Sequence, residues 1–94
     1  MPGKSLTAVV VEYEPGGSSV SHRHAGVVFA YVLSGAIRSR LDSGETRVYR
    51  AGETFFEDPG VRHTVSENAS ATEPASLLAV FVADDGATLK TDEP

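Results

Sequence analysis

Hydrophobic positions along this chain come in short runs separated by turn residues. Runs rich in Val, Ile, Phe and Tyr are typical of β-strands, and Gly, Pro, Asp and Asn between them are typical of turns. No segment shows the 3.6-residue period of an amphipathic helix. The pattern predicts strands at residues 6–13, 18–24, 27–33, 36–41, 46–49, 54–56, 61–66 and 76–83. We therefore expect an all-β fold of about eight strands, arranged as a sandwich, jelly roll or barrel.

Two of these runs also indicate which side chains face inward. Residues 27–33 (VVFAYVL) are apolar throughout, which is typical of a strand buried on both faces. Residues 36–41 (AIRSRL) alternate, and with residues 46–49 they are predicted to form a hairpin. Beyond the last apolar run the chain is polar, so we expect the tail at 84–94 to fray.

Composition narrows the function classes. The chain has 94 residues, which predicts a single domain at 1–94. A net charge of −5 without a basic stripe argues against a nucleic-acid partner. With no cysteine there is no disulfide, zinc–thiolate site or thiol nucleophile. No run approaches the roughly 18 apolar residues that cross a bilayer, and the N-terminal residues do not resemble a signal sequence, so we expect no membrane partner and a cytoplasmic location.

The three histidines fall at two places in this pattern. His22 and His24 are two residues apart in a predicted strand, so both rings project from one face. His63 follows the turn at Pro59-Gly60, near the start of another strand. Neutral imidazole binds zinc, iron, copper and nickel, and three converging rings would leave coordination positions open for water or substrate. The pattern favours a metal site, although His-x-His alone also occurs on strands that bind no metal.

The spacing of these histidines and the surrounding glycines resembles the cupin superfamily. The first cupin motif is Gly, five residues, His-x-His, three or four residues, Glu, six residues and Gly. In this chain the run at 16–35 reads Gly16, His22, His24, Val28 and Gly35. The second motif is Gly, five residues, Pro-x-Gly, two residues, His, three residues and Asn. The run at 52–67 reads Gly52, Asp58-Pro59-Gly60, His63 and Glu67. The resemblance implies a small cupin jelly-roll barrel.

The departures from the motifs bear on the chemistry. Val28 stands where the family places a metal-binding glutamate, Asp58 stands in the proline position, and Glu67 stands in the asparagine position with Asn68 beside it. A site with three neutral ligands keeps the full positive charge of the metal, which favours anionic, chelating substrates such as enolates, carboxylates or thiolates. Some cupin dioxygenases use three histidines. The resemblance therefore implies a mononuclear oxygenase of the dioxygenase type, with Fe(II) favoured and Mn, Ni, Cu or Zn as alternatives.

Two other functions fit the same residues. Without the usual glutamate or an obvious general acid or base, the chain could be a non-catalytic small-molecule-binding or sensor cupin. It could also be a non-redox, metal-assisted lyase, isomerase or hydrolase, which zinc or nickel would indicate. In each case the partner is a small molecule. If Val28 faces the metal, Ala30 and Val32 also face inward and form a pocket wall of small aliphatic side chains.

Several features receive a structural interpretation. Phe29, Tyr31, Phe55 and Phe56 are predicted to be core residues rather than pocket residues. Arg38 and Arg40 are interpreted as a solvated or edge-guarding face. Glu57 and Asp58 are interpreted as a solvated turn in preference to a hydrogen-bond partner for an imidazole N–H. A homodimer is expected because cupins are commonly dimeric, with the apolar strands at 6–13 and 76–83 covering a partner's edge.

Overall fold

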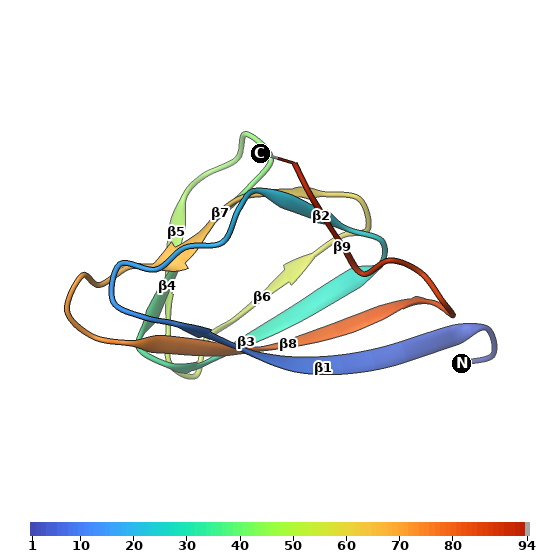
Figure 1. Ribbon diagram of the computed structural model, residues 1–94, viewed down its shortest axis with the longest axis horizontal. Coiled ribbons are helices and arrows are strands. Elements are labelled where there is room, and N and C mark those ends of the chain that lie inside the picture. Colours follow the sequence, from blue (N-terminus) through green and yellow to red (C-terminus); the bar gives the residue numbers. More distant parts are fainter. Residues whose placement is uncertain (94) are drawn as a thin grey trace.

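The computed structural model describes residues 1–93, which form nine β-strands (Figure 1). The strands are β1 Lys4–Tyr13, β2 His22–His24, β3 Val27–Ser34, β4 Ala36–Leu41, β5 Arg47–Arg50, β6 Thr54–Glu57, β7 Arg62–Asn68, β8 Ala75–Asp84 and β9 Lys90–Asp92. All eight predicted strands are present, and β9 is an addition. The all-β prediction is confirmed.

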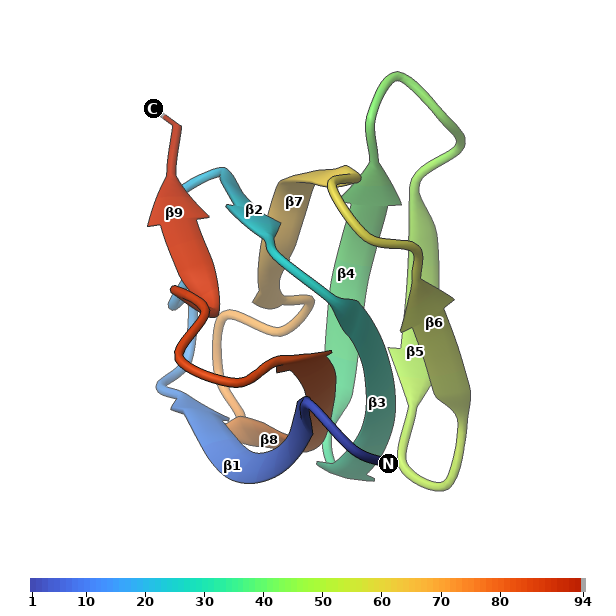
Figure 2. The same cartoon turned by 90° about the vertical axis from the view of Figure 1, so that its right-hand side faces the viewer.

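The strands form two antiparallel sheets. One has the order β1-β8-β3-β6 and the other has the order β5-β4-β7-β2-β9. Figures 1 and 2 show the first sheet along one side of the molecule and β2, β7 and β9 on the other. Only β4 and β5 are consecutive strands in one sheet, and they pair as the predicted hairpin. Every other connection crosses from one sheet to the other, so residues distant in sequence meet between the sheets.

Glycine is required at two of these crossings. Gly26 joins β2 to β3, and a Cβ there would lie 1.9 Å from the carbonyl oxygen of Val82. Gly35 joins β3 to β4 with φ +70°, and a Cβ there would lie 2.6 Å from the carbonyl oxygen of Pro74. Any larger residue would push the turning backbone away from β8. These glycines allow the two sheets to approach closely at their shared corners.

A compact hydrophobic core fills the space between the sheets. The four-stranded sheet contributes most of it, and Ile37 on β4 closes it from the other side with no exposed surface. Val28, Ala30 and Val32 are at most 2% exposed, so they face inward as the alternation predicts. The buried members are Tyr13, Val28, Ala30, Val32, Ile37, Phe55, Ala75, Leu77 and Ala79.

The prediction that the aromatic residues lie in the core is wrong for three of the four. Phe55 is buried, whereas Phe29, Tyr31 and Phe56 are exposed on the outer face of the four-stranded sheet. The reason is strand alternation, because Val28 and Ala30 take the inward positions and send their neighbours outward.

The expected fraying of the C-terminal segment is also wrong. Lys90–Asp92 form β9, which pairs antiparallel with β2 and places Lys90 opposite His24. Without β9, the backbone donors and acceptors on this side of β2 would form an unpaired sheet edge. Pairing with β9 satisfies them, and Arg23 adds an ion pair to Glu93. Residue 94 of the predicted tail lies outside the described residues.

β2 is shorter than predicted. Ser18 makes only an isolated bridge to Glu67, and Val20 is 50% exposed instead of sharing the inward face with His22 and His24. The backbone before His22 follows β7 irregularly, because the Ser19 amide donates to the Ser66 carbonyl. Within residues 1–93, no helix is long and apolar enough to cross a membrane.

Candidate metal centre

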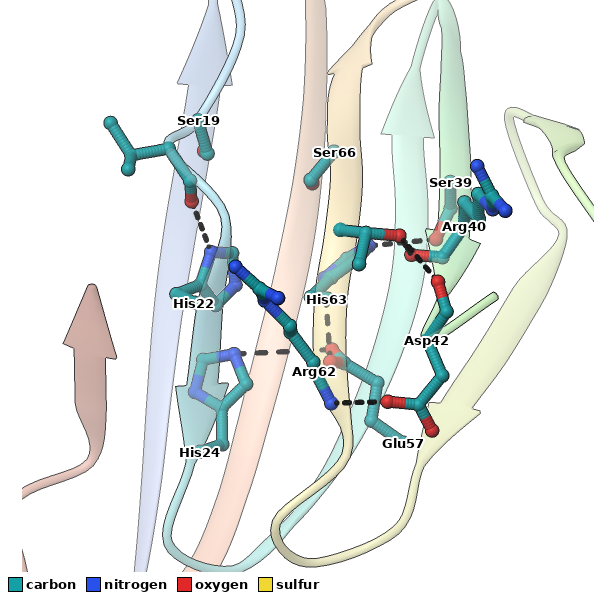
Figure 3. A network of polar contacts seen from close by, with 12 residues as sticks. Ser19, His22, His24, Ser39, Arg40, Asp42, Glu57, Arg62, His63 and Ser66 are labelled. Carbon is teal, nitrogen blue, oxygen red and sulfur yellow. Dashed lines mark hydrogen bonds and ion pairs between the residues drawn. The ribbon is translucent and has the colours of Figure 1, made fainter. Parts of the chain in front are cut away.

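The three histidines converge between the sheets, as Figure 3 shows. β2 pairs with β7 so that His22 lies opposite His63, and His24 lies two residues along the same face of β2. The ring centroid of His22 is 4.7 Å from that of His24 and 5.1 Å from that of His63. One ring nitrogen from each residue lies within 4.8 Å of the other two. All three side chains are buried.

Backbone carbonyls orient two of the rings. Nδ1 of His22 donates to the Val20 carbonyl at 2.7 Å, and Nδ1 of His24 donates to the Leu89 carbonyl at 2.9 Å. Since a carbonyl only accepts, Nδ1 carries the proton in both rings and Nε2 carries the free lone pair. This arrangement, an imidazole fixed by a hydrogen bond at its far nitrogen, is the usual support of metal-binding histidines.

His63 is held differently. Its Nε2 lies 2.7 Å from the hydroxyl of Ser39, a buried residue on β4. Its Nδ1 lies 3.3 Å from Oε1 of Glu57. A hydroxyl can donate or accept, so Ser39 allows a lone pair on the Nδ1 of His63.

Glu57 is a site residue that the sequence interpretation assigned to a solvated turn. Its side chain is 3% exposed, so the predicted solvated turn is wrong for Glu57, whereas Asp58 is exposed as expected. The signal was available: the strand was expected to end at Phe56, but one more step of alternation from buried Phe55 turns residue 57 inward. The Oε1 of Glu57 has no hydrogen-bond partner, and its Oε2 lies 4.0 Å from Nε2 of His24.

A cavity of about 130 Å³ opens beside the histidines. Val28 and Ala30 line it, while Val32 lies deeper in the core and does not contribute to its wall. The rest of the wall is mostly apolar, with Phe55, Leu77, Ala79 and Phe81 among the lining residues. Lys90 is the one lining residue that is exposed, and its ammonium group forms an ion pair with Asp92 at 3.3 Å.

Burial acts on the protonation of the site. Removal from water lowers the pKa of His22 below its ordinary 6.5, because the protonated ring loses its hydration. The hydrogen bond to Val20 opposes this shift, and the nearby His24, His63 and Lys90 reinforce it. A neutral ring is the form that binds a metal ion.

The donor set fits a divalent cation. Two ligand atoms that are each about 2.1 Å from one ion lie about 3.0 Å apart at a right angle and about 3.4 Å apart at the tetrahedral angle. The 3.3 Å between His63 Nδ1 and Glu57 Oε1 falls in this range. The ring nitrogens lie within 4.8 Å of one another, so a closure of up to about 1.4 Å would bring them into the same range. A buried carboxylate oxygen without a partner is a further sign that a cation belongs at this position.

The two arginines stay out of the cavity. Arg38 forms an ion pair with Glu67, and Arg40 donates to the Gly44 carbonyl at 3.0 Å. Neither lines the cavity, so neither clamps a ligand there.

A β-bulge explains the altered second motif. Arg40 pairs with Val65 while Leu41 pairs with His63, which leaves Thr64 as an extra residue on β7. The extra residue shifts the alternation by one, so Asn68 instead of Glu67 is turned inward and buried. The asparagine of the motif is therefore displaced by one position and not lost.

Comparison with known proteins places the fold in a family. Residues 9–81 match the family model Cupin_2, described as "Cupin domain". The chain is a cupin. The predicted resemblance is confirmed, together with the two-sheet cupin fold.

Two curated relatives share parts of this cupin. It is 40% identical over 57 residues to phomopsin biosynthesis cluster protein C' of Diaporthe leptostromiformis. The aligned residues cover 61% of this chain and 30% of that protein. It is 27% identical over 75 residues to the cupin-domain-containing oxidoreductase fogC of Aspergillus ruber. Here the aligned residues cover 80% of this chain and 37% of that protein. The cupin thus spans about a third of the length of the curated relatives it matches.

Among solved structures, the cupin is similar to the DMSP lyase DddQ from Ruegeria pomeroyi DSS-3. The TM-score is 0.79 at 22% identity, with 93% of this chain and 42% of that chain covered. At this identity the likeness shows the shared fold.

Proposed function

We propose that this cupin binds one divalent metal ion, with Fe(II) favoured, through His22, His24 and His63. We propose further that it acts as a mononuclear oxygenase of the dioxygenase type on a small, chelating substrate. The observation that carries the proposal is the convergence of three buried imidazoles, two with inward lone pairs, on a largely apolar cavity. The similarity to a relative named as an oxidoreductase supports the redox class.

The residues of the chain have separate tasks in this proposal. The histidines hold the ion, and their hydrogen bonds to Val20 and Leu89 keep two rings in the binding tautomer. The apolar wall, with Val28 and Ala30 in it, keeps bulk water away from the substrate. When bound, an Fe(II) ion supplies the redox chemistry with dioxygen and a positive centre for chelation.

The cavity limits the size of the substrate. Its volume of about 130 Å³ is below that of drug-sized pockets, which start at about 300 Å³. An apolar cavity of about 150 Å³ holds one benzene molecule. The expected substrate therefore has a body of about six heavy atoms inside the cavity.

Metal analysis tests the centre itself. Protein purified without added metal, then titrated with Fe(II) under nitrogen, should bind one equivalent. His63→Ala should lose that equivalent, while Arg40→Ala, outside the cavity, should retain it. Full metal content in His63→Ala would refute the proposed ligand set.

Turnover separates the functions that share this site. Oxygen consumption with a panel of β-dicarbonyls, thiols and catechols should rise above background for the Fe(II) protein and vanish in His63→Ala. Binding of a panel member without oxygen consumption would replace the oxygenase with a binding or sensor module. Zinc as the native metal would instead indicate a non-redox lyase, isomerase or hydrolase.

We also propose that a second copy of this cupin covers the outer face of the four-stranded sheet. β8 is an interior strand, so residues 76–83 have no open edge with which to pair with a partner. Their outward side chains instead belong to a continuous apolar face. It comprises Leu6, Ala8, Val10, Val27, Phe29, Tyr31, Phe56, Leu78, Val80 and Val82. A face of this extent without an internal charge meets its own copy without like-charge repulsion.

A matched pair of variants tests the dimer by light scattering. Phe29 on this face and Val48 on β5 are both 43% exposed. Phe29→Lys should convert a dimer to a monomer, whereas Val48→Lys should leave the mass unchanged. A monomeric wild-type protein would refute the proposal.

The single domain at 1–94 and the cytoplasmic location stay predictions from the sequence.

A further inference from the structure

Glu57 lies across from the position where the first cupin motif expects its glutamate. β3 and β6 pair antiparallel with Val28 directly opposite Glu57. Side chains of directly opposite residues project from the same face of a sheet, with Cβ atoms about 5 Å apart. Both residues line the cavity and both are buried. The carboxylate absent at residue 28 is therefore present at the adjacent position of the same wall, on a different strand.

The surroundings of Glu57 suit a metal ligand. The side chain is 3% exposed, and its Oε1 has no hydrogen-bond partner. A buried carboxylate without compensation is costly, so such groups are paired or bind metals. Its two oxygens face the two rings that flank it, Oε1 at 3.3 Å from His63 Nδ1 and Oε2 at 4.0 Å from His24 Nε2 (Figure 3). Among the inward-facing residues of the four-stranded sheet, Glu57 is the only one with a formal charge.

We propose that Glu57 is the fourth, anionic ligand of the metal centre, supplied by β6 in place of the missing glutamate on β3. The inference rests on the proposed metal site and changes its chemistry. Instead of three neutral ligands, the ion has three imidazoles and one carboxylate, which cancels one unit of its positive charge. Nε2 of His22, Nε2 of His24 and Nδ1 of His63 are the nitrogens that the structure leaves for it.

If Glu57 is a metal ligand, its carboxylate should be replaceable by one at a neighbouring position. A purely structural role of Glu57 would not predict this. If the site needs a carboxylate from this wall, the carboxylate can be moved across the strand pair. Glu57→Gln keeps the size of the side chain and removes its charge. Val28→Glu in the same chain puts a carboxylate back at the position that the family motif uses.

The experiment measures metal affinity and coordination in four proteins: wild type, Glu57→Gln, the double variant Val28→Glu/Glu57→Gln, and His63→Ala. The probe is Co(II), followed by competition titration and by its visible absorption spectrum. Glu57→Gln should bind at least about tenfold more weakly and show a changed spectrum, and the double variant should recover most of the affinity. Circular dichroism and urea unfolding verify that each variant is folded.

Three results would overturn the inference. Affinity of Glu57→Gln within about twofold of wild type would show that the carboxylate does not act on the metal. A tenfold loss with an unchanged Co(II) spectrum would make Glu57 a residue that only orients His63. No recovery in a folded double variant would show that a carboxylate at residue 28 cannot replace Glu57, against the proposal that β6 supplies the ligand in place of β3.

Failure of the centre is distinguished from failure of the inference. If wild type binds Co(II) and His63→Ala does not, the three-histidine site stands whatever Glu57 does. If wild type binds no Co(II), both proposals fail together. Should Glu57→Gln not fold, Glu57→Asp replaces it: this variant keeps the charge but shortens the reach, and a loss of affinity with an altered spectrum is expected again.

Discussion

The two sheets of this cupin divide the work of the site unequally. The five-stranded sheet carries all three histidines and the buried polar residues Ser39, Ser66 and Asn68. The four-stranded sheet turns small and aromatic apolar side chains into the cavity, and Glu57 is its one charged contribution. A ligand ring needs hydrogen bonds at its far side, whereas a wall that excludes water needs none.

The difference shows where the site is vulnerable. The positions of the histidines on the five-stranded sheet depend on short, irregular features. These are the three-residue β2, the bulge at Thr64 and the added β9. The four-stranded sheet is more regular: β1 and β8 pair over ten residues without a shift, and the pairing of β3 with β8 shifts register once, between Val32 and Ser34. Changes at the crossings and irregular features should therefore cost more than changes on the regular sheet.

The largest effect is expected where the chain passes between the sheets at Gly26. In Gly26→Ala the new methyl group would lie 1.9 Å from the Val82 carbonyl oxygen, a clash with backbone that no side-chain rotation relieves. We expect a loss of about 3 kcal/mol or more in the free energy of unfolding, measured by urea denaturation. Gly86→Ala is the control: its φ is +77° but no atom lies within 4 Å, so backbone strain of about 1 kcal/mol is all it should lose. Equal losses in the two variants would contradict this account.

The next largest loss of stability is expected at Asn68 on the five-stranded sheet. The amide of Asn68 donates to the carbonyls of Glu14 and Glu73 and accepts from the amide of Ser70. At about 1 kcal/mol for each hydrogen bond, Asn68→Ala should lose about 3 kcal/mol in the free energy of unfolding. The neighbouring Glu67→Gln removes only a half-exposed ion pair to Arg38 and should lose less than about 1 kcal/mol. If Glu67→Gln were the more damaging change, the displacement of the motif asparagine to residue 68 would be wrong.

The sequence was sufficient to predict the regular parts of the molecule. Apolar runs bounded by turn residues located the strands β1 to β8, and period-two alternation placed Val28, Ala30 and Val32 inward. The convergence of the three histidines could be inferred because two spaced motifs constrain which strands become neighbours. These predictions depend on local patterns that the fold repeats.

The irregular parts could not be predicted in the same way. The bulge at Thr64 breaks period two, so counting from His63 led to Glu67 instead of Asn68. β9 has no apolar pattern, since its residues Lys-Thr-Asp are all exposed and its pairing depends on the open edge of β2. Glu57 follows a strand that was expected to end one residue earlier. In each case a tertiary contact determined whether the residue is buried or paired. The residue itself is polar, so its type gave no sign of that contact.

Removing β9 tests whether metal binding by the five-stranded sheet depends on this C-terminal strand. A chain ending at Ala87 loses the Leu89 carbonyl that accepts from Nδ1 of His24, so the ring is no longer held in its binding tautomer. We expect metal affinity to fall by about 10- to 100-fold in a Co(II) titration. The control Glu93→Gln keeps β9 and removes only the exposed ion pair to Arg23, so its affinity should be close to that of wild type. Unchanged affinity in the shortened chain would show that His24 needs no support from this strand.

The smallest effect is a pH dependence of stability that comes from His22 on the five-stranded sheet. Burial lowers the pKa of His22 in the folded protein below 6.5, while the unfolded chain keeps the ordinary value. The unfolded state therefore binds more protons in the window below 6.5, so the stability present above that pH is lost as the pH falls through it. Urea midpoints of the metal-free protein between about pH 7.5 and pH 5.5 should decrease, and His22→Gln should reduce the decrease. An equally steep decrease in His22→Gln would assign the pH dependence to groups other than His22.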